Sequence, residues 1–306
     1  MTKTEMTSSP NHHTTQLYTL NSNSWHAVEF DGLITAAERT HAIEKGSVLF
    51  FPKLAFLLSP EEQALLSPQL TNPKHKNISL QKNNHLKGLR GSKAQHDSTL
   101  AMIARYQQYT RLLINNLFPH YQNTLRTEPT SLRLHRVEAR HTSWRKDDTR
   151  LHIDAFPSRP NHGERILRVF TNISPKGEAR VWRIGAPFEK IAQQFIPRTR
   201  PLLPGAAWLM NQLGITKRAR SAYDQLMLQL HDAMKSDQHY QSQGSQQTIH
   251  FPAGSTWVCY SDQVPHAVMA GQFMLEQTYF LSPQHMMHPE YAPLSILQNL
   301  TQKKLV

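Results

Sequence analysis

Residues 150–157 read R-L-H-I-D-A-F-P, and residues 261–268 read S-D-Q-V-P-H-A-V. Side chains two positions apart on a strand point to the same face, so His152 and Asp154 can reach one metal ion while Ile153 packs behind them. His266 follows Asp154 by 112 residues and would come from another strand. Two imidazoles and one carboxylate cover one face of an octahedral iron and leave three positions open, as in non-haem Fe(II) oxygenases. We therefore predict that these three residues bind iron.

Two other interpretations of this pattern stay open. H-x-D is a short motif in a chain that contains 18 histidines, so the three residues can also be ordinary polar groups at a strand edge. Zinc is an alternative metal, although the chain carries no accompanying catalytic motif such as H-E-x-x-H. The motif alone does not separate these cases.

Composition limits the class of protein. A hydrophobic content of 39% over 306 residues is enough for a large core. Cys259 is the sole cysteine, which rules out an internal disulfide and favours a reducing compartment. No apolar run is long enough to span a bilayer and no signal segment opens the chain, so we predict a cytoplasmic protein without a transmembrane segment.

The net charge of +12 favours anionic partners. No zinc finger, helix-turn-helix or aromatic RNA-binding motif is present, so nucleic acid is not expected among them. The densest basic stretch covers residues 75–93. It is either a solvated loop or a patch that meets phosphate groups.

Hydrophobic periodicity predicts the organisation of the chain. Residues 1–24 are polar and predict a mobile tail, whereas residues 25–306 predict a single domain. Helix signals come first and strand patterns follow. Helices are expected at residues 36–44 and 97–118 and from Ser59 onward, and strands at residues 47–52, 131–140, 256–260 and from His266. This order favours an α+β fold: a double-stranded β-helix (jelly-roll) core with supporting N-terminal and inserted helices.

A helical insert is predicted near residues 215–242. Its apolar side chains fall on one helical face: Tyr223, Leu226, Met227, Leu230, Ala233 and Met234. We predict a helix packed on the barrel. A lid or a lipid-facing helix is the alternative, because the basic run K-R-A-R occupies residues 217–220.

Arg168 stands in the middle of R-I-L-R-V-F-T-N-I, a stretch typical of a buried strand. A buried guanidinium needs an anionic partner. Iron oxygenases of this kind take 2-oxoglutarate as co-substrate, and its distal carboxylate calls for a cation that binds it with two hydrogen bonds. Residues 271–278, where such a cation often lies, contain no Arg or Lys. We predict that Arg168 binds 2-oxoglutarate, with a structural salt bridge as the alternative.

Arg180 and Trp182 are two positions apart in E-A-R-V-W-R-I-G and should share one strand face. A guanidinium beside an indole suits a sugar acid, whose carboxylate binds the cation while its ring packs on the aromatic plane. Arg133, on the preceding strand pattern, can add a third cation. We predict that Arg133, Arg180 and Trp182 bind a substrate with a carboxylate.

Four longer blocks carry a resemblance to a known family: residues 143–160, 165–175, 177–185 and 261–278. The sequence resembles the Kdo hydroxylases of Gram-negative bacteria, Fe(II)- and 2-oxoglutarate-dependent oxygenases. The resemblance implies O₂-dependent hydroxylation of 3-deoxy-D-manno-oct-2-ulosonic acid (Kdo) at C3 on Kdo–lipid A, which gives Ko in the lipopolysaccharide inner core. It implies iron at His152, Asp154 and His266, in a pocket lined by Arg133, Arg168, Arg180 and Trp182.

The resemblance also implies a location and a second shell of contacts. A basic protein that acts on Kdo–lipid A would attach peripherally to the inner membrane. Asp147, Asp148 and Asp262 are candidates for orienting the two imidazoles, with ordinary loop residues as the alternative. Two alternatives remain: the same oxygenase chemistry on another substrate, such as a small acid or a protein side chain, and a non-catalytic jelly-roll binding module.

Overall fold

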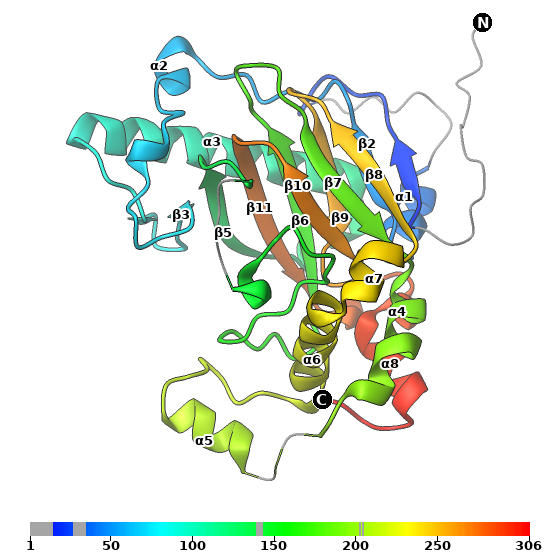
Figure 1. The fold of residues 1–306 in the computed structure, drawn as a ribbon. Coiled ribbons are helices and arrows are strands. Elements are labelled where there is room, and N and C mark those ends of the chain that lie inside the picture. Colours follow the sequence, from blue (N-terminus) through cyan, green and yellow to red (C-terminus); the bar gives the residue numbers. More distant parts are fainter. Residues whose placement is uncertain (1–14, 27–34, 139–142, 202, 204) are drawn as a thin grey trace, which may run out of the picture.

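Two β-sheets of unequal size form the centre of the molecule (Figure 1). The computed structural model describes residues 15–26, 35–138, 143–201, 203 and 205–306. The larger sheet is mixed, since β1 and β2 pair in parallel and its other strand pairs are antiparallel. In spatial order it contains β1 (Leu17–Thr19), β2 (Val48–Phe51), β9 (Thr256–Tyr260), β6 (Arg165–Asn172), β11 (Met274–Leu281), β5 (Arg126–Arg133), β3 (Ile78–Leu80) and β4 (Leu86–Lys87).

The smaller sheet is antiparallel and contains β10 (His266–Ala270), β7 (Arg180–Gly185) and β8 (Gln246–Phe251). Aromatic side chains fill the space between the two sheets. Trp182 of the smaller sheet packs edge-on against Phe170 and Trp257 of the larger one, and Phe251 stacks on Trp257 with ring centroids 4.0 Å apart. This aromatic layer fixes the spacing between the two sheets.

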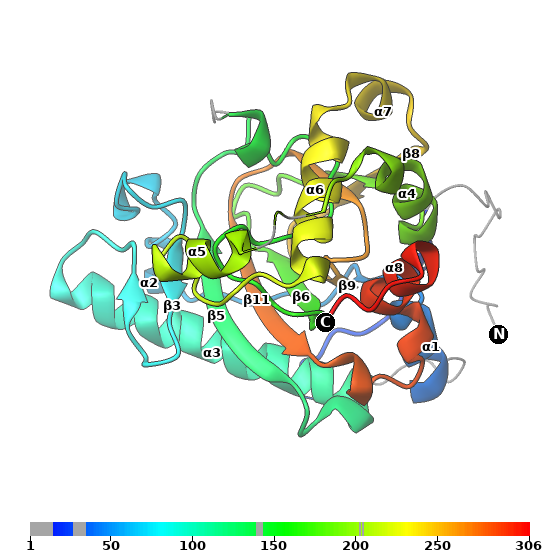
Figure 2. The ribbon, with the colours of Figure 1, turned by 90° about the horizontal axis from the view of Figure 1, so that it is seen from below.

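Helices cover the sheets in two groups (Figures 1 and 2). The long helix α3 packs on the larger sheet, where the Tyr106 hydroxyl reaches the carbonyl oxygen of Val169. A second group packs around the start of β10 and forms a separate apolar cluster. The α-helices are α1 (Ala36–Glu44), α2 (Pro60–Gln63), α3 (Lys93–Leu117), α4 (Phe188–Phe195), α5 (Ala206–Gln212), α6 (Ala222–Ser236), α7 (Gln238–Gln243) and α8 (Pro293–Thr301).

Short 3₁₀ helices link several of these elements: Pro68–Leu70, Pro119–Tyr121, Trp144–Lys146, Ile196–Arg198, Pro283–His285 and Pro289–Tyr291. Among the described residues, no helix combines the length and the apolar character that crossing a bilayer requires.

The helix starts predicted at residue 36 and at Ser59 are confirmed, because their capping residues act locally. Thr35 and Ser59 each accept a hydrogen bond from the backbone N–H three residues ahead, and the glutamate side chain at that position accepts one from the backbone N–H of the cap residue. The long helix begins at Lys93, four residues before the predicted start, because Ser92 and Gln95 form a further capping box. The α+β class is confirmed as a large mixed sheet with supporting helices.

Two sequence predictions fail near strand ends. The strand predicted at residues 131–140 is β5, which ends at Arg133; residues 139–142 lie outside the described chain. The ladder stops there because Arg133 already pairs with Met274, the first residue of β11. The predicted tail is also wrong over residues 17–19, which pair with β2, and Leu20 is buried. Residues 1–14 lie outside the described chain.

The helical insert packs on the body, as predicted. Helix α6 starts at Ala222 rather than near Ile215, because Ser221 caps it in a box with Asp224. Its apolar face joins the cluster that contains Leu151 and Ile153, which flank the first histidine of the H-x-D motif. The insert therefore supports the motif from behind.

Candidate metal centre and substrate cavity

The structure brings His152, Asp154 and His266 together. One ligand atom from each lies within 4.8 Å of the others, and His152 Nε2 is 4.0 Å from Asp154 Oδ1. The backbones of the two histidines exchange both hydrogen bonds, at 3.0 and 2.8 Å. The H-x-D motif was predicted to lie on a strand. In the structure it lies on an extended segment that makes only this isolated bridge, His152 to His266, and it is outside the regular strands. The segment is extended enough to aim both side chains at one point.

Backbone carbonyls orient the two imidazoles. His152 Nδ1 lies 2.7 Å from the carbonyl oxygen of Arg150, and His266 Nδ1 lies 2.9 Å from that of Val264. A carbonyl only accepts, so each Nδ1 carries the proton and each Nε2 keeps its lone pair for a metal.

The three aspartates considered for this orienting role are engaged elsewhere and lie in turns and loops, as in the alternative interpretation. Asp262 pairs with Arg165 at 2.8 Å, with both side chains fully buried. Asp147 caps Thr149 at 2.9 Å, and Asp148 pairs with Lys76. A carbonyl two residues before each histidine lies within easy reach of its Nδ1, which leaves no place for a carboxylate.

The electrostatics of the three side chains fit a divalent cation. Burial lowers the pKa of His152 and His266, so both imidazoles are neutral. Burial would raise the pKa of Asp154, but the Arg168 guanidinium outweighs it and holds that pKa well below its ordinary value. Two neutral imidazoles and one ionised carboxylate are a donor set that fits Fe(II).

A cavity of about 930 Å³ opens above these ligands and is lined by all seven residues that the sequence singled out. They are Arg133, His152, Asp154, Arg168, Arg180, Trp182 and His266. The Trp182 indole stacks on the His266 ring, with centroids 5.0 Å apart and planes 19° apart. Trp182 therefore also holds a ligand ring in place, a role that the sequence did not indicate.

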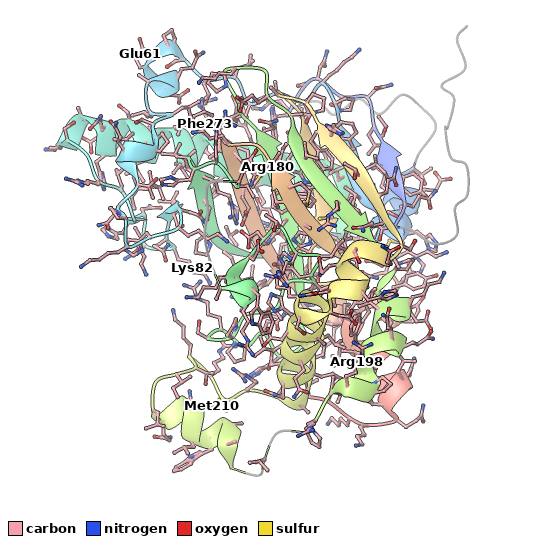
Figure 3. The ribbon with its side chains drawn as sticks, viewed as in Figure 1. Glu61, Lys82, Arg180, Arg198, Met210 and Phe273 are labelled. Carbon is pink, nitrogen blue, oxygen red and sulfur yellow. The ribbon has the colours of Figure 1, made fainter. Side chains whose placement is uncertain are left out.

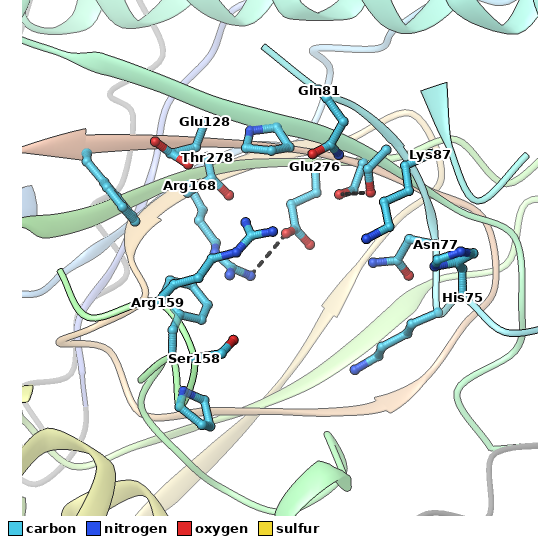
Figure 4. A pocket seen from close by; sticks show the side chains of 17 residues that line it. His75, Asn77, Gln81, Lys87, Glu128, Ser158, Arg159, Arg168, Glu276 and Thr278 are labelled. Atoms are coloured by element: carbon cyan, nitrogen blue, oxygen red, sulfur yellow. Dashed lines mark hydrogen bonds and ion pairs between the residues drawn. The ribbon is translucent and has the colours of Figure 1, made fainter. Parts of the chain in front are cut away.

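Arg168 lies in a buried network of ion pairs. Its guanidinium contacts Asp154 Oδ2 at 3.3 Å. It also contacts Glu276 Oε1 at 3.1 Å (Figure 4). Arg133 pairs with the other oxygen of Glu276 at 2.7 Å. Two arginines thus face two carboxylates, and the charges balance. The salt bridge that the sequence left open as an alternative for Arg168 is present.

Arg180 has a different environment. Its Nη1 donates to the carbonyl oxygens of Gly271 and Gln272 at 3.0 and 3.3 Å, and its Nε has no partner. Among the described residues no carboxylate lies within ion-pair distance of it. Burial, with repulsion from Arg133, lowers its pKa to about 9. A buried positive charge in the cavity lining is therefore left without a counter-ion among the described residues.

Comparison with known proteins identifies the family. The sequence matches the family profile described as 3-deoxy-D-manno-oct-2-ulosonic acid (Kdo) hydroxylase over residues 34–304. The chain belongs to the Kdo hydroxylase family. The apo structure of the Kdo hydroxylase KdoO, a non-heme Fe(II) alphaketoglutarate-dependent dioxygenase, is 44% identical and matches with a TM-score of 0.90. The match covers 95% of this chain and 98% of KdoO.

Two further KdoO structures match over the same shares of both chains, again at 44% identity. One holds alphaketoglutarate and Fe(III), with a TM-score of 0.89. The other holds cobalt(II), with a TM-score of 0.90. A search of curated proteins found no match.

The Kdo hydroxylase cavity contains functional groups that the sequence reasoning missed. Glu276 lies within the buried strand β11. It could have been found from the sequence, because a charged residue inside an apolar strand pattern is the signal that identified Arg168. Lys235 and His231 come from α6, four residues apart and both buried. The His231 ring packs edge-on against the His152 ring at 5.4 Å, and Lys235 donates to the carbonyl oxygen of Arg145 at 3.0 Å. No local pattern indicated that α6 faces the metal centre.

The cavity continues into a second hollow of about 360 Å³, here called the mouth groove (Figure 4). Both hollows share His75, Lys76, Phe156, Pro157, Arg168 and Glu276. The basic stretch at residues 75–93 thus supplies part of this wall, including Lys87 from β4. It is therefore more than a solvated loop, because its cations face the approach to the metal centre.

Proposed function

We propose that this member of the Kdo hydroxylase family hydroxylates Kdo at C3, with Fe(II), 2-oxoglutarate and O₂, on Kdo–lipid A. The observation that carries the proposal is the meeting of three ligand atoms within 4.8 Å at the base of an arginine-lined cavity. The 44% identity to KdoO over nearly the whole chain supports iron, with 2-oxoglutarate as co-substrate, rather than zinc as the metal.

His152, Asp154 and His266 would hold the iron. When bound, the iron couples oxidative decarboxylation of 2-oxoglutarate to the insertion of one oxygen atom into a C–H bond of the sugar. The protein presents two neutral Nε2 atoms and one charged oxygen on a single face and leaves the opposite face open to the cavity. Trp182 and the backbone carbonyls keep the imidazole rings from turning away.

The sequence predicted that Arg168 binds 2-oxoglutarate, but the contacts favour Arg180. Arg168 already has two carboxylate partners, whereas Arg180 is a buried cation with carbonyl partners alone. Arg180 also shares a face of β7 with Trp182, which stacks on the metal ligand His266. The distal carboxylate of a co-substrate that reaches from the metal past Trp182 would give Arg180 its counter-ion.

The sugar acid would then enter through the mouth groove. Lys76, Lys87 and Arg159 line that approach and attract an anionic ligand. Arg133 and Arg168 line the main cavity, where both pair with Glu276 and Arg168 also contacts the metal ligand Asp154. Both can meet the Kdo carboxylate when Glu276 shares its hydrogen bonds. The predicted substrate contacts of Arg133 and Trp182 fit this path, because both line the main cavity.

We also infer that the two sheets are the halves of a double-stranded β-helix within one domain. From β6 to β11 the chain passes from the larger sheet to the smaller, back to the larger at β9, and alternates again through β10 and β11. This winding brings the His152 segment beside β10 at the open end between the sheets. It therefore explains why residues so distant in sequence meet.

One assay separates this proposal from its alternatives. Purified protein with Fe(II), 2-oxoglutarate and O₂ is incubated with Kdo–lipid A, with a Kdo oligosaccharide that has no acyl chains, or with no acceptor, and succinate is measured. Succinate coupled to one added oxygen on Kdo supports the proposal. Uncoupled turnover indicates another substrate, and no turnover under any condition indicates a binding module.

A further inference from the structure

Large apolar side chains are exposed together on one projecting segment. Nine large hydrophobic residues are exposed in the described part of the chain, and five of them fall between residues 203 and 215. These five are Leu203 (77% exposed), Trp208 (62%), Leu209 (51%), Leu213 (65%) and Ile215 (54%). We call them the apolar loop; it is built around α5, which stands away from the sheets and faces the viewer in Figure 2. Scattered exposed apolar residues are ordinary, but a cluster on one element marks an interaction site.

The ends of this segment are fastened to the body. Arg200 exchanges two hydrogen bonds with the Gln229 side chain on α6, both at 2.6 Å. After the apolar loop, the backbone of Lys217 donates to the carbonyl oxygen of Ser158 at 3.0 Å, and Arg220 donates to that of Pro157 at 2.8 Å. Pro157 and Ser158 line the mouth groove. The apolar loop is thus held beside the entrance to the metal centre with its large side chains outward.

The stretch of chain that contains the apolar loop carries charge of one sign. Residues 190–223 contain six Lys or Arg and no Asp or Glu. Lys217 and Arg218 line a groove of about 470 Å³, which shares Arg159 with the mouth groove. Within the described residues, Arg159, Lys217 and Arg218 have no carboxylate partner. A positive path therefore runs from the apolar loop to the cavity.

We propose that the apolar loop inserts into an anionic lipid bilayer and turns the mouth groove toward the membrane surface. Trp208 and the leucines would enter the region between headgroups and acyl chains, where an indole is favoured. Lys217 and Arg218 would lie at headgroup level against anionic lipid. This rests on the proposed function in one respect: a sugar carried by a membrane lipid would reach the metal through a groove that faces the bilayer.

A bilayer fits this surface better than a protein partner. The segment at residues 190–223 joins apolar side chains to cations and contains no acidic residue, and Glu128 in the adjoining groove is paired with Lys82 and Arg126. This combination complements anionic headgroups above an apolar interior. A second copy of this chain would bring the same positive charge to the contact. The cations beside the apolar loop lead into the mouth groove through Arg159. A substrate held in the membrane could therefore reach the cavity from the side of the apolar loop.

Vesicle flotation tests the proposal. The probes are vesicles of equal parts phosphatidylglycerol and phosphatidylcholine, and vesicles of phosphatidylcholine alone, neither containing Kdo. We expect the wild-type protein to float with the first and to be released as salt rises. The double variant Trp208→Ser/Leu209→Ser should bind at least about tenfold more weakly, because it removes most of two apolar side chains. Lys217→Gln/Arg218→Gln should weaken binding by about fivefold per charge.

Matched controls separate insertion from general surface effects. Leu57→Ser removes an equally exposed leucine (78%) next to α2, whose Glu61 lies at the opposite end of the molecule from Met210 of α5 (Figure 3). Lys45→Gln/Lys53→Gln removes two exposed cations near α1 and β2. Both controls should bind as the wild type does. In addition, anionic vesicles should shift the tryptophan emission of the wild type to the blue but not that of Trp208→Phe.

Three results would overturn the inference. They are failure of the wild type to bind anionic vesicles, unchanged binding by Trp208→Ser/Leu209→Ser, and self-association without vesicles that this variant abolishes, which would mean that a second copy covers the surface. These outcomes are independent of the proposed function. Flotation needs no turnover, and hydroxylation of a Kdo oligosaccharide without acyl chains needs no membrane.

Discussion

Replacing Arg180 and Arg168 one at a time should give opposite patterns of stability and co-substrate binding. Arg180→Met removes a buried cation that has no carboxylate partner among the described residues. Arg168→Met removes a cation that balances Asp154 and Glu276. Methionine keeps much of the length of each side chain and adds no charge, so the comparison isolates the two guanidinium groups.

The magnitudes follow from the surroundings of each arginine. Burial and repulsion from Arg133 lower the pKa of Arg180 from its ordinary value to about 9, which disfavours the protonated form in the fold by about 5 kcal/mol. Two hydrogen bonds from a charged donor return about 3–6 kcal/mol. The two effects nearly cancel, and Arg180→Met should change the free energy of unfolding of the ligand-free protein by less than about 2 kcal/mol. Arg168→Met leaves the buried carboxylates of Asp154 and Glu276 without this cation and should lower the free energy of unfolding by about 3–5 kcal/mol.

Binding should show the reverse order. Loss of a buried cation that meets a carboxylate costs about 2–5 kcal/mol, so Arg180→Met should weaken 2-oxoglutarate binding by about a hundredfold or more. Urea unfolding of the metal-free proteins and calorimetric titration of the cobalt-loaded proteins with 2-oxoglutarate measure the two quantities. If Arg180→Met keeps wild-type affinity while Arg168→Met loses it, Arg168 is the co-substrate anchor and the allocation argued here is refuted.

Three further variants test other parts of the site. His152→Ala should abolish cobalt binding and turnover while circular dichroism stays native; wild-type activity would show that the ligand assignment is wrong. Burial would raise the pKa of Glu276, but its two arginine partners lower it, so the ionised carboxylate stabilises the fold above its ordinary pKa of 4.5 and loses this effect as pH falls through the lowered value. Glu276→Gln should therefore be less stable near neutral pH by about 2–4 kcal/mol, and urea unfolding should show the deficit shrinking under acid; a deficit independent of pH contradicts this. Asp262→Asn should lose about 3–5 kcal/mol, because Arg165 stays buried without its partner, yet 2-oxoglutarate titration should be unchanged, and weakened binding would place Asp262 in the site.

Several features of the fold could be predicted because they depend on short segments. Thr35 and Ser59 cap helices through contacts with residues three positions ahead, and the run at residues 256–260 forms a strand with the predicted bounds. The strand boundaries that failed depend on a distant partner. β5 stops where β11 begins, and residues 17–19 form a strand because β2 lies beside them.

The sequence by itself determined the kind of chemistry. Metal ions select residue types, and the spacing of His152, Asp154 and His266, with the longer blocks around them, was enough to indicate an iron site and the Kdo hydroxylase family. The tertiary structure alone decided the roles of the charged groups. Which carboxylate meets Arg168, and that none among the described residues meets Arg180, depends on which strands become neighbours. The exposure of the apolar loop was equally hidden, because an apolar residue in a sequence does not reveal whether the rest of the chain covers it.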